Sequence, residues 1–444
     1  MPTSYSISGF PEWSPEQRIV EKRVLEKIED SFRLYGFINI ETCGVESYES
    51  LMKKGDGKEI YRLAKAGSGE ENLGLHFDLT LPLARYVLER RGELVFPFRR
   101  FQIQKVWRGE RPQGGRYREF YQADIDIVSQ GELPKHFEYE VPLAMCHTLK
   151  SLSPLGLGNF TMHINNRKLS EGFYRALGIK DVEETLRRID KLDKLGVQKT
   201  RQILEEVAGE RGAEACLDLA QIKETDPRRL GERLKDLCKK WNVEGPSEET
   251  DLMWEGAKDA EAVLSSLVRS GFEGACIDCA IARGLDYYTG CVYETFLQEA
   301  PSLGSICSGG RYENLISTPK QKYPGVGMSI GVSRLLSHLF SKARADRVSP
   351  AVALVTVWSE EEREKSDEVA RILRERGIAC EVSPSASKLG AQIKRADRLS
   401  IPYVWFVSDE GEEVKDIRTG DQKKADPAFW EPDPKYAADI IVRE

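Results

Sequence analysis

The chain lacks any apolar run long enough to cross a lipid bilayer. The longest such run, near residues 351–358, is far shorter than the roughly 20 apolar residues of a membrane-spanning helix. The first residues carry neither a basic start nor an apolar centre, so the sequence predicts no secretory signal. We therefore expect no membrane segment and a cytoplasmic protein.

Cysteines are few and irregularly spaced. There are nine, an odd number between Cys43 and Cys380, without the dense framework of a disulfide-stapled secreted domain, which predicts reduced thiols. Cys276 and Cys279 form one C-x-x-C pair, which could be half of a zinc site. There is no second such pair and no histidine nearby in sequence, so we expect both to be core residues.

Two common nucleotide-binding patterns are also absent: G-x-x-x-x-G-K-[S/T], and G-x-G-x-x-G after a strand. The net charge of −7 gives no general attraction for nucleic acid, so an RNA-binding surface would need local basic patches. With 444 residues, 40% of them hydrophobic and 31% charged, the composition predicts a globular chain of two or three domains.

The most informative feature is a cluster of arginines in residues 99–128. Two strand-like segments flank a Pro/Gly turn at residues 112–115, which predicts a β-hairpin. The alternative to a binding site is a basic surface hairpin whose arginines pair with Glu110 and Glu119. Planar guanidinium groups suit polyphosphate oxygens, and four surround this turn: Arg108, Arg111, Arg116 and Arg118.

Four segments match, in order, the motifs of one enzyme family. They are LHFDLTLP at residues 75–82, VWRGERP with GRYREFYQ at 106–122, RGLDYYTG at 283–290 with CSGGRY at 307–312, and GVGMSIGVSRL at 325–335. The second and fourth resemble motifs 2 and 3 of class II aminoacyl-tRNA synthetases. RGLDYYTG is the strongest single match and resembles the signature of the histidyl-tRNA synthetase family. The four together are far more specific than any one.

This resemblance implies an enzyme that joins L-histidine to tRNA(His) through a histidyl-adenylate. ATP would be a substrate, with Mg²⁺ as cofactor, and AMP and diphosphate as products. A homodimer is also implied. Because hydrogen bonds to the polar ring can discriminate histidine, no editing domain is required on physical grounds.

The phosphate-binding residues are also implied by the resemblance. Activation needs the substrate carboxylate in line with the α-phosphate of ATP and positive charge at the reacting centre. Arg108 and Arg283 are assigned to both groups and are the catalytic candidates. The sequence does not identify the ligands of Mg²⁺. The implied ATP-binding set is Arg108, Glu110, Arg116, Phe120 (stacking on adenine) and Arg334, and Arg111 and Gln113 would contact the tRNA acceptor end.

Recognition of histidine needs partners for both ring nitrogens, because a buried unpaired polar group is costly. The resemblance assigns the imidazole to Asp126 and Tyr288. It assigns the α-amino group to Asp78, Thr80 and Gln122. The full implied histidine-binding set is Asp78, Leu79, Thr80, Arg108, Gln122, Asp126, Arg283, Tyr287, Tyr288 and Tyr312.

Taken singly, several of these residues fit ordinary structural roles. Tyr288 could be a strand residue packed under a helix, and Asp126 a solvent-facing carboxylate of an alternating strand. Arg334 could be a surface charge of a helix, and the glycines of residues 325–331 could allow close packing. Joint occurrence of the four motifs favours the functional interpretation.

Apolar periodicity predicts a helix over residues 15–36, ending at Gly36, and a strand over 37–40. Both resemble motif 1, the dimer-forming element of the family, although Cys43 stands where the family usually has proline. After a predicted strand at 160–164, charged helical stretches at 182–195 and 231–240 predict a helical insertion, and the sheet is expected to resume near Ala275.

The predicted fold is α+β: an antiparallel catalytic sheet flanked by helices, a helical insertion and a C-terminal α/β anticodon-binding domain. Strand–helix alternation after residue 351 predicts a small, mostly parallel sheet, and KLGAQIK at 388–394 and DIRTGDQ at 416–422 match the family there. The predicted boundaries are 1–169 and 256–345 for the catalytic core, 170–255 for the insertion and 346–444 for the last domain.

Two other functions remain open from the sequence. One is a non-catalytic paralogue such as the regulatory subunit of ATP phosphoribosyltransferase, which typically lacks the histidine signature and the C-terminal domain. The other is a ligase that passes an adenylated amino acid to an acceptor other than tRNA. RGLDYYTG and the C-terminal motifs favour the synthetase over both.

Overall fold

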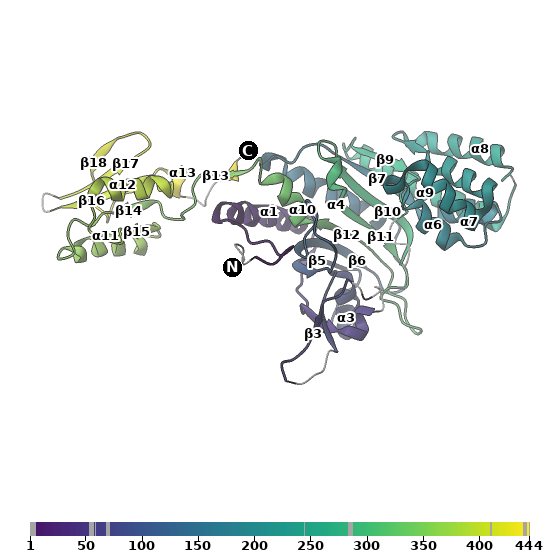
Figure 1. Ribbon diagram of the computed structural model, residues 1–444, viewed down its shortest axis with the longest axis horizontal. Coiled ribbons are helices and arrows are strands. Elements are labelled where there is room, and N and C mark those ends of the chain that lie inside the picture. The colour runs from purple at the N-terminus through teal and green to yellow at the C-terminus, as the bar shows by residue number, and fades with distance from the viewer. Residues whose placement is uncertain are drawn as a thin grey trace, which may run out of the picture. The chain divides into compact units, whose positions relative to one another are not determined.

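The structure is a computed structural model that describes residues 6–52, 57, 59–67, 72–243, 245–282, 287–408, 411–437 and 442–443. The chain forms two compact units (Figure 1). The first contains Met1–Glu12 and Leu25–Leu339, and the second Trp13–Val24 and Phe340–Glu444. The division of the first unit into catalytic core and insertion stays a prediction.

A nine-stranded sheet forms the centre of the first unit, in the order β1-β5-β6-β12-β11-β10-β7-β9-β8. Neighbours are antiparallel except for the pairs β1–β5 and β7–β9, so the predicted antiparallel sheet is confirmed with parallel pairs toward its edges. The strands are β1 Ile38–Asn39, β5 Phe98–Trp107, β6 Glu119–Val128, β7 Phe160–Asn166, β8 Lys223–Glu224, β9 Ala275–Asp278, β10 Tyr288–Leu297, β11 Ser305–Tyr312 and β12 Gly325–Gly331.

The predicted arginine-bearing hairpin is formed by β5 and β6, whose register runs from Phe98 opposite Val128 to Trp107 opposite Glu119. Side chains of a strand alternate between faces, so every second residue of β6 shares one face. Gln122, Asp124 and Asp126 are such residues. This register places predicted site residues of β6 beside β12, which carries motif 3.

Shorter elements surround the sheet. The predicted first helix is α1, Pro15–Leu34, of which only the part from Leu25 onward belongs to this unit. Gly36 follows with a left-handed φ of 72°, which glycine adopts without strain. A three-stranded sheet has the order β2-β4-β3. The remaining elements of this part are β2 Val45–Ser47, α2 Tyr48–Met52, β3 Arg62–Leu63, β4 Leu73–Leu75, α3 Thr80–Arg90, α4 Phe137–Ser151, a 3₁₀ turn at Ser153–Leu155, another at Pro301–Leu303, and α10 Val332–Leu339.

Helices gather beside strands β7 and β9 (Figure 1). Here α9 begins at a capping box in which Ser247 and Thr250 each accept a hydrogen bond from the other's backbone N–H. Gly256 of α9 lies so close to the backbone of Leu169 that a Cβ would be 2.3 Å from its nitrogen, so glycine permits this packing. The elements are α5 Arg167–Ala176, α6 Val182–Ile189, α7 Leu192–Ala220, a 3₁₀ turn at Pro227–Arg229, α8 Leu230–Trp241 and α9 Glu248–Arg269.

The second unit contains a five-stranded sheet of order β15-β14-β16-β17-β18. Strands β15, β14 and β16 are parallel, but β16–β17 and β17–β18 are antiparallel, so the expected mostly parallel sheet is half antiparallel. The DIRTGDQ motif forms the tight β17–β18 connection, which the sequence did not predict. The elements are β13 Arg344–Ala345, β14 Ala353–Val355, α11 Arg363–Glu375, β15 Cys380–Val382, α12 Leu389–Arg398, β16 Tyr403–Ser408, β17 Gly411–Asp416, β18 Gln422–Lys424, α13 Pro434–Ala437 and β19 Val442–Arg443.

Core packing in this unit follows the alternation of β14. Val355 packs in a cluster with Leu373 of α11 and Trp405 of β16. Leu354, which points to the other face, packs with Ala396 of α12 and Val404. Both faces of the sheet are therefore covered, as expected for parallel strands. Within the described part of the chain, no helix combines the length and apolar character needed to span a bilayer.

Candidate active site

A cavity of about 140 Å³ lies beside the β5–β6 hairpin in the first unit, and residues of β11, β12 and α10 also line it. The residues that the resemblance assigned to ATP all lie here: Arg108, Glu110, Arg116, Phe120 and Arg334. The cavity also contains residues that the sequence analysis did not single out, among them Tyr117, Ser305, Ser308 and Ser329. We call this cavity the phosphate end of the site.

Arg108 is held by mostly neutral neighbours. Its Nε donates to the Phe77 carbonyl oxygen at 2.9 Å, and its Nη2 donates to Gln122 Oε1 at 3.4 Å. The guanidinium carbon is 5.2 Å from the centre of the Phe120 ring, a cation–π contact. Among the described residues, the carboxylate that pairs with it is Glu110, whose Oε1 is 4.0 Å from Nη1. Most of the positive charge is therefore available to an anionic ligand.

The residues of the turn lie in three different settings, and Arg334 of α10 joins Arg116 in the cavity. Arg116 Nη1 lies 3.6 Å from Glu110 Oε2 inside the cavity, and Arg334 donates to the Ser305 carbonyl oxygen. Arg118 instead holds the N-terminal segment, because its backbone N–H donates to the Gly9 carbonyl oxygen at 2.7 Å. Arg111 and Gln113 are exposed on the turn, where Gln113 exchanges backbone hydrogen bonds with Arg116 at 2.9 and 3.2 Å.

The N-terminus of α3 lies on the other side of Arg108. Asp78 is 6% exposed, and its Oδ1 accepts from the Leu81 N–H at 3.0 Å, which fixes the carboxylate at the start of the helix. Leu79 is fully buried and Thr80 is the first helical residue. Helix α3 is anchored to the sheet by Leu83 and Val87, which share a core cluster with Tyr312.

Asp126 is the best-connected carboxylate of the site. Its Oδ2 is 2.6 Å from Arg100 Nη2, and its Oδ1 accepts from the Tyr312 hydroxyl at 2.9 Å. The side chains of Arg100 and Asp126 are 0% and 5% exposed. Burial, followed by the nearby Asp126 charge, raises the pKa of Tyr312 well above its usual value, so Tyr312 remains a hydrogen-bond donor. We call Asp78, Asp126, Arg100 and Tyr312 the amino-acid end of the site.

Arg100 is a buried partner of the predicted site residue Asp126 that the sequence analysis did not single out. Arg100 Nη2 also contacts the carbonyl oxygen of Leu79 at 3.4 Å, so one guanidinium joins the residue before α3 to Asp126. The signal was present in the sequence, because a hairpin register that pairs Trp107 with Glu119 also places Arg100 opposite Asp126. A solvent-facing position for Asp126, the structural alternative, is wrong because the carboxylate is buried.

The glycines of motif 3 provide space for these side chains. A Cβ on Gly327 would lie 2.0 Å from Asp126 Oδ1, and one on Gly325 would lie 2.5 Å from the Tyr312 ring. Contacts this short cannot occur without displacement of the side chain. The close-packing interpretation of these glycines therefore agrees with the functional one, because the residues that they accommodate belong to the predicted site.

Gln122 is bound at the phosphate end and shares a face of β6 with Asp126 of the amino-acid end. Its Oε1 accepts from Arg108, while its Nε2 donates to Ser329 Oγ at 2.6 Å. Gln122 is 8% exposed, so its amide is fixed by these partners. Both ends are thereby joined through one strand, β6, and its neighbour β12.

Tyr288 begins β10 and pairs in register with Tyr312 of β11. The ring centres of Tyr287 and Tyr288 are 4.2 Å apart, and Tyr287 packs beside the cluster that contains Tyr312. Loss of solvation raises the pKa of Tyr288 well above its usual value. Arg283, the catalytic candidate in RGLDYYTG, lies outside the described residues, so its position is not part of this geometry.

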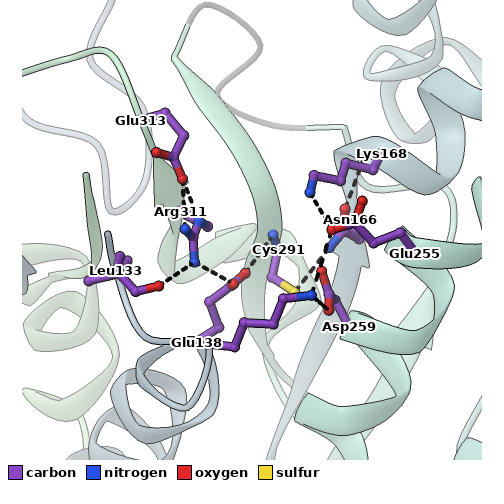
Figure 2. Close-up of polar contacts among 10 residues, drawn as sticks. Leu133, Glu138, Asn166, Lys168, Glu255, Asp259, Cys291, Arg311 and Glu313 are labelled. Carbon is purple, nitrogen blue, oxygen red and sulfur yellow. Dashed lines mark hydrogen bonds and ion pairs between the residues drawn. The ribbon is translucent and has the colours of Figure 1, made fainter. Parts of the chain in front are cut away.

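A buried ionic network supports β10 and β11 (Figure 2). Arg311 Nη1 donates to Glu138 Oε1 at 2.9 Å, and Glu138 Oε2 accepts from the Cys291 N–H at 3.1 Å. A further contact joins the Cys291 thiol to Asn166 Nδ2 at 3.3 Å. This network fixes β10 and β11 close to Tyr288 and Tyr312.

The cysteines are free, and eight of the nine are buried. Cys276 and Cys279 are each 1% exposed, which confirms the expected core position. In the part of the chain that the structure describes, no group of three or more His, Cys, Asp or Glu side chains could hold a metal ion.

Comparisons with known proteins agree with this geometry. The family model for histidyl-tRNA synthetase matches residues 9–335, and the model for an anticodon binding domain matches residues 351–427. A histidine–tRNA ligase of Bifidobacterium animalis subsp. lactis is 52% identical over 98% of this chain and 97% of that protein. The histidine–tRNA ligase of Cutibacterium acnes is 47% identical over 96% of both chains.

Solved structures show the same fold. The crystal structure of histidyl-tRNA synthetase from Nostoc sp. PCC 7120 superposes with a TM-score of 0.80 at 33% identity, over 96% of this chain and 97% of that one. An ATP phosphoribosyltransferase regulatory subunit/histidyl-tRNA synthetase from Bacillus halodurans C has a TM-score of 0.69 at 21% identity, covering 89% and 97%, and shows the fold alone. The motifs, the fold and the near full-length relatives establish that this chain belongs to the histidyl-tRNA synthetase family of class II aminoacyl-tRNA synthetases.

Proposed function

We propose that this chain activates L-histidine with ATP and transfers it to tRNA(His). The carrying observation is a juxtaposition in the first unit: a cavity lined by Arg108, Arg116 and Arg334 lies beside the buried carboxylates of Asp78 and Asp126. Cations on one side suit the triphosphate, while carboxylates on the other suit the ammonium and imidazole groups of histidine.

In this proposal each side chain has one task. Arg108 and Arg283 bring the substrate carboxylate and the α-phosphate together, and Arg116 and Arg334 bind the outer phosphates. Phe120 stacks on adenine. Once ATP is bound, these charges are held close to the α-phosphate, where they stabilise the negative charge that develops there.

At the amino-acid end, Asp126 and Tyr288 form hydrogen bonds with the two imidazole nitrogens. The α-ammonium group is bound by Asp78, Thr80 and Gln122. Leu79, Tyr287 and Tyr312 shape the pocket. Arg100 holds Asp126 in place through the 2.6 Å contact, and Tyr312 fixes the other carboxylate oxygen. An amino acid without the ring nitrogens would leave these groups unpaired.

Mg²⁺ is expected to neutralise part of the triphosphate charge. Glu110 is the carboxylate among the residues that line the phosphate end, and Mg²⁺ in nucleotide sites is commonly held by one or two carboxylates together with phosphate oxygens. Glu110 together with the phosphate oxygens of ATP therefore fits a magnesium ion that is bound chiefly by ATP.

The decisive test is ATP–pyrophosphate exchange with the full-length protein and each of the twenty amino acids. We expect exchange that depends on histidine and on Mg²⁺. Absence of histidine-dependent exchange in protein that is folded by circular dichroism would contradict the proposal. Histidine-dependent exchange without tRNA charging would instead support the alternative amino-acid ligase.

The second unit is proposed to bind the anticodon region of tRNA(His). Lys388 and Lys394 are exposed at the start and middle of α12, in the segment that matches the anticodon-binding family. Replacing both by glutamate should raise the KM for tRNA at least about tenfold, because lysine–phosphate contacts dominate such binding. Exchange with histidine should be unchanged. Lys365→Glu on α11 is the matched control, and equal loss in the control would contradict a specific role for α12.

Two further properties are proposed. Strand β1 lies at the edge of the large sheet and exposes Ile38, while Leu34 is 87% exposed at the end of α1; an uncovered apolar edge of this kind suits a second copy of the chain. Free, mostly buried thiols suit the reducing cytoplasm, where we expect the protein to act. Sedimentation analysis would test the homodimer.

A further inference from the structure

Asp124 occupies the middle of the polar surface that connects the two ends of the site. It lies between Gln122 and Asp126 on the same face of β6, opposite Gln102 of β5 and Ser329 of β12. It is 3% exposed. The family resemblance gave this residue no role, although its neighbours on both sides were assigned to histidine.

The hydrogen bonds around Asp124 have a defined direction. Gln122 Nε2 donates to Ser329 Oγ at 2.6 Å, which leaves the single hydroxyl proton of Ser329 for its hydrogen bond to Asp124. The other carboxyl oxygen, Oδ1, has no hydrogen-bond partner among the described residues. A carboxyl that is buried between two residues proposed to bind the substrate, and that has one oxygen unpaired, is a candidate for a contact that forms only with ligand.

Charged and titratable groups face Asp124 from each neighbouring element. Arg100 of β5 is the cation; Asp126 of β6 and Asp78 before α3 are the anions. Cys307 of β11 and Tyr288 of β10 also interact with it, and burial raises the pKa of both, so neither carries charge near neutral pH. Arg100 therefore acts on Asp124 as well as on Asp126, its ion-pair partner.

This arrangement raises the pKa of Asp124 to about 7, chiefly because burial removes it from water. The Arg100 charge and the Ser329 hydrogen bond act in the opposite direction, and Asp126 and Asp78 add to the increase. The imidazole of histidine titrates in the same range, with a typical pKa of about 6.5. The two groups can therefore exchange one proton at little cost.

We propose that Asp124 sets the charge state in which histidine is bound, because Asp124 and the imidazole ring together hold one proton. The inference rests on the proposed function. With neutral imidazole, Asp124 is a protonated carboxylic acid. With imidazolium, the same proton has moved to the ring and Asp124 is a carboxylate. No other group gains or loses a proton.

Charge balance explains why the pocket needs this group. In the proposed complex, Arg108 and Arg283 are matched by the substrate carboxylate and the α-phosphate, and Asp78 and Asp126 are offset by Arg100 and by the α-ammonium group of the substrate. An ionised Asp124 would then leave one buried negative charge without a partner unless the ring is protonated, and uncompensated buried charge is strongly unfavourable. A neutral residue at this position would instead exclude imidazolium.

The consequence is a specific pH dependence. Above pH 7 the free enzyme has lost the Asp124 proton and free histidine is neutral, so binding must take up one proton and weakens as pH rises. Below about pH 6.5 both partners carry a proton, and binding must release one. Affinity should therefore be greatest between these values.

Asp124→Asn should remove only the weakening of histidine binding above pH 7. In the wild-type protein we expect the KM for histidine in pyrophosphate exchange to rise about tenfold between pH 7 and pH 8.5. In the variant it should change less than about twofold over this range, while the rise below pH 6.5 persists in both. Titration calorimetry at pH 8 in two buffers of different ionisation enthalpy should show close to one more proton taken up by wild type than by the variant. The KM for ATP is the internal reference.

Two further variants keep the test decisive. Ser329→Ala removes a hydrogen bond that favours the ionised form, so it should move the alkaline rise to higher pH even if Asp124→Asn fails to fold. Asp259→Asn, which alters a carboxylate paired with Lys135 at 2.8 Å outside the site, should retain the wild-type profile. An alkaline rise that is absent in wild type, or equal in wild type and Asp124→Asn, would overturn the inference. Lack of histidine-dependent exchange at pH 7 would instead overturn the proposed function.

Discussion

The two ends of the candidate active site differ in how deeply their charged side chains are buried and in how closely these are paired. At the phosphate end, the side chains of Arg108, Glu110 and Arg116 are 32%, 33% and 37% exposed, and their charged atoms are 3.6 to 4.0 Å apart. At the amino-acid end, Arg100 and Asp126 are almost completely buried and lie 2.6 Å apart. One end is loosely paired and open, and the other is tightly paired before any ligand binds.

This difference follows from what each end must recognise. A triphosphate brings several charges and can pull exposed arginines into new bidentate contacts, since exposed ion pairs are weak. Histidine brings a small polar ring that must be told apart from similar amino acids. Buried partners with fixed geometry provide that discrimination, because the wrong ligand leaves them unpaired. Binding of the triphosphate is therefore served by exposed arginines, whereas selectivity for histidine requires buried side chains.

A substitution at the buried amino-acid end should have the largest effect on stability and on activity with histidine. Asp126→Ala removes the partner of Arg100 and should cost about 3–5 kcal/mol of folding free energy, because a buried guanidinium is left uncompensated. The same change should lower kcat/KM for histidine by about 2–4 kcal/mol, with little change in the KM for ATP. Denaturant titration and pyrophosphate exchange measure the two quantities.

Asp126→Asn is the matched variant, because it keeps an acceptor for the Tyr312 hydroxyl while it removes the charge. It should retain more stability than Asp126→Ala but still show the selective loss for histidine. If both variants damaged the KM for histidine and for ATP equally, Asp126 would be a structural carboxylate and the contrast between the two ends would fail.

Variants of Arg283 test whether this residue supplies the positive charge that stabilises adenylate formation between the two ends. Removal of one preorganised group at a reacting centre commonly lowers kcat by about 10²- to 10³-fold, so Arg283→Ala should slow adenylate formation to this extent. Arg283→Lys should also be poor, since an ammonium cannot contact carboxylate and phosphate as a planar fork does. Single-turnover formation of histidyl-adenylate is the measurement.

Transfer from preformed histidyl-adenylate to tRNA provides the control for Arg283. This step should be slowed less than adenylate formation, because the α-phosphate is then part of the leaving group rather than the atom under attack. Adenylate formation at the wild-type rate in Arg283→Ala would remove the arginine from the catalytic set.

The comparison also explains what could be read from the sequence. The hairpin, the first helix and the order of elements in the second unit follow from local signals: a Pro/Gly turn, helical periodicity ended by Gly36, and strand–helix alternation. Strands β17 and β18 were not predicted, and the sheet was expected to be mostly parallel, because strand direction depends on pairing partners, which a single strand does not specify. DIRTGDQ was matched to the family, but its tight connection was not recognised.

At the site, the open end was the easier half to predict. Its arginines are close in sequence and their residue type already suggests phosphate. The buried end depends on partners brought together by register, so Arg100 was overlooked although it lies opposite Asp126. Asp124 resembled any polar residue of an alternating strand. Only its burial and its neighbours across β5 and β12 distinguish it.

Arg116 at the open end should give the smallest effect and so sharpens the contrast. Its side chain is 37% exposed and its nearest carboxylate contact in the cavity, with Glu110, is 3.6 Å long. Arg116→Ala should therefore leave stability within about 0.5 kcal/mol of wild type, as expected for a surface substitution. The KM for ATP should rise about five- to tenfold, corresponding to about 1 kcal/mol for one partly solvated phosphate contact. The KM for histidine should stay within twofold of wild type.

Salt dependence distinguishes the two ends further. Because salt screens exposed charges, the difference in the KM for ATP between Arg116→Ala and wild type should shrink as salt increases, whereas the loss in kcat/KM for histidine caused by Asp126→Ala should not. Exchange kinetics at two ionic strengths give this comparison directly. A salt-insensitive loss, or one shared equally by histidine, would mean that Arg116 becomes buried with ligand and that the two ends are more alike than their unliganded geometry indicates.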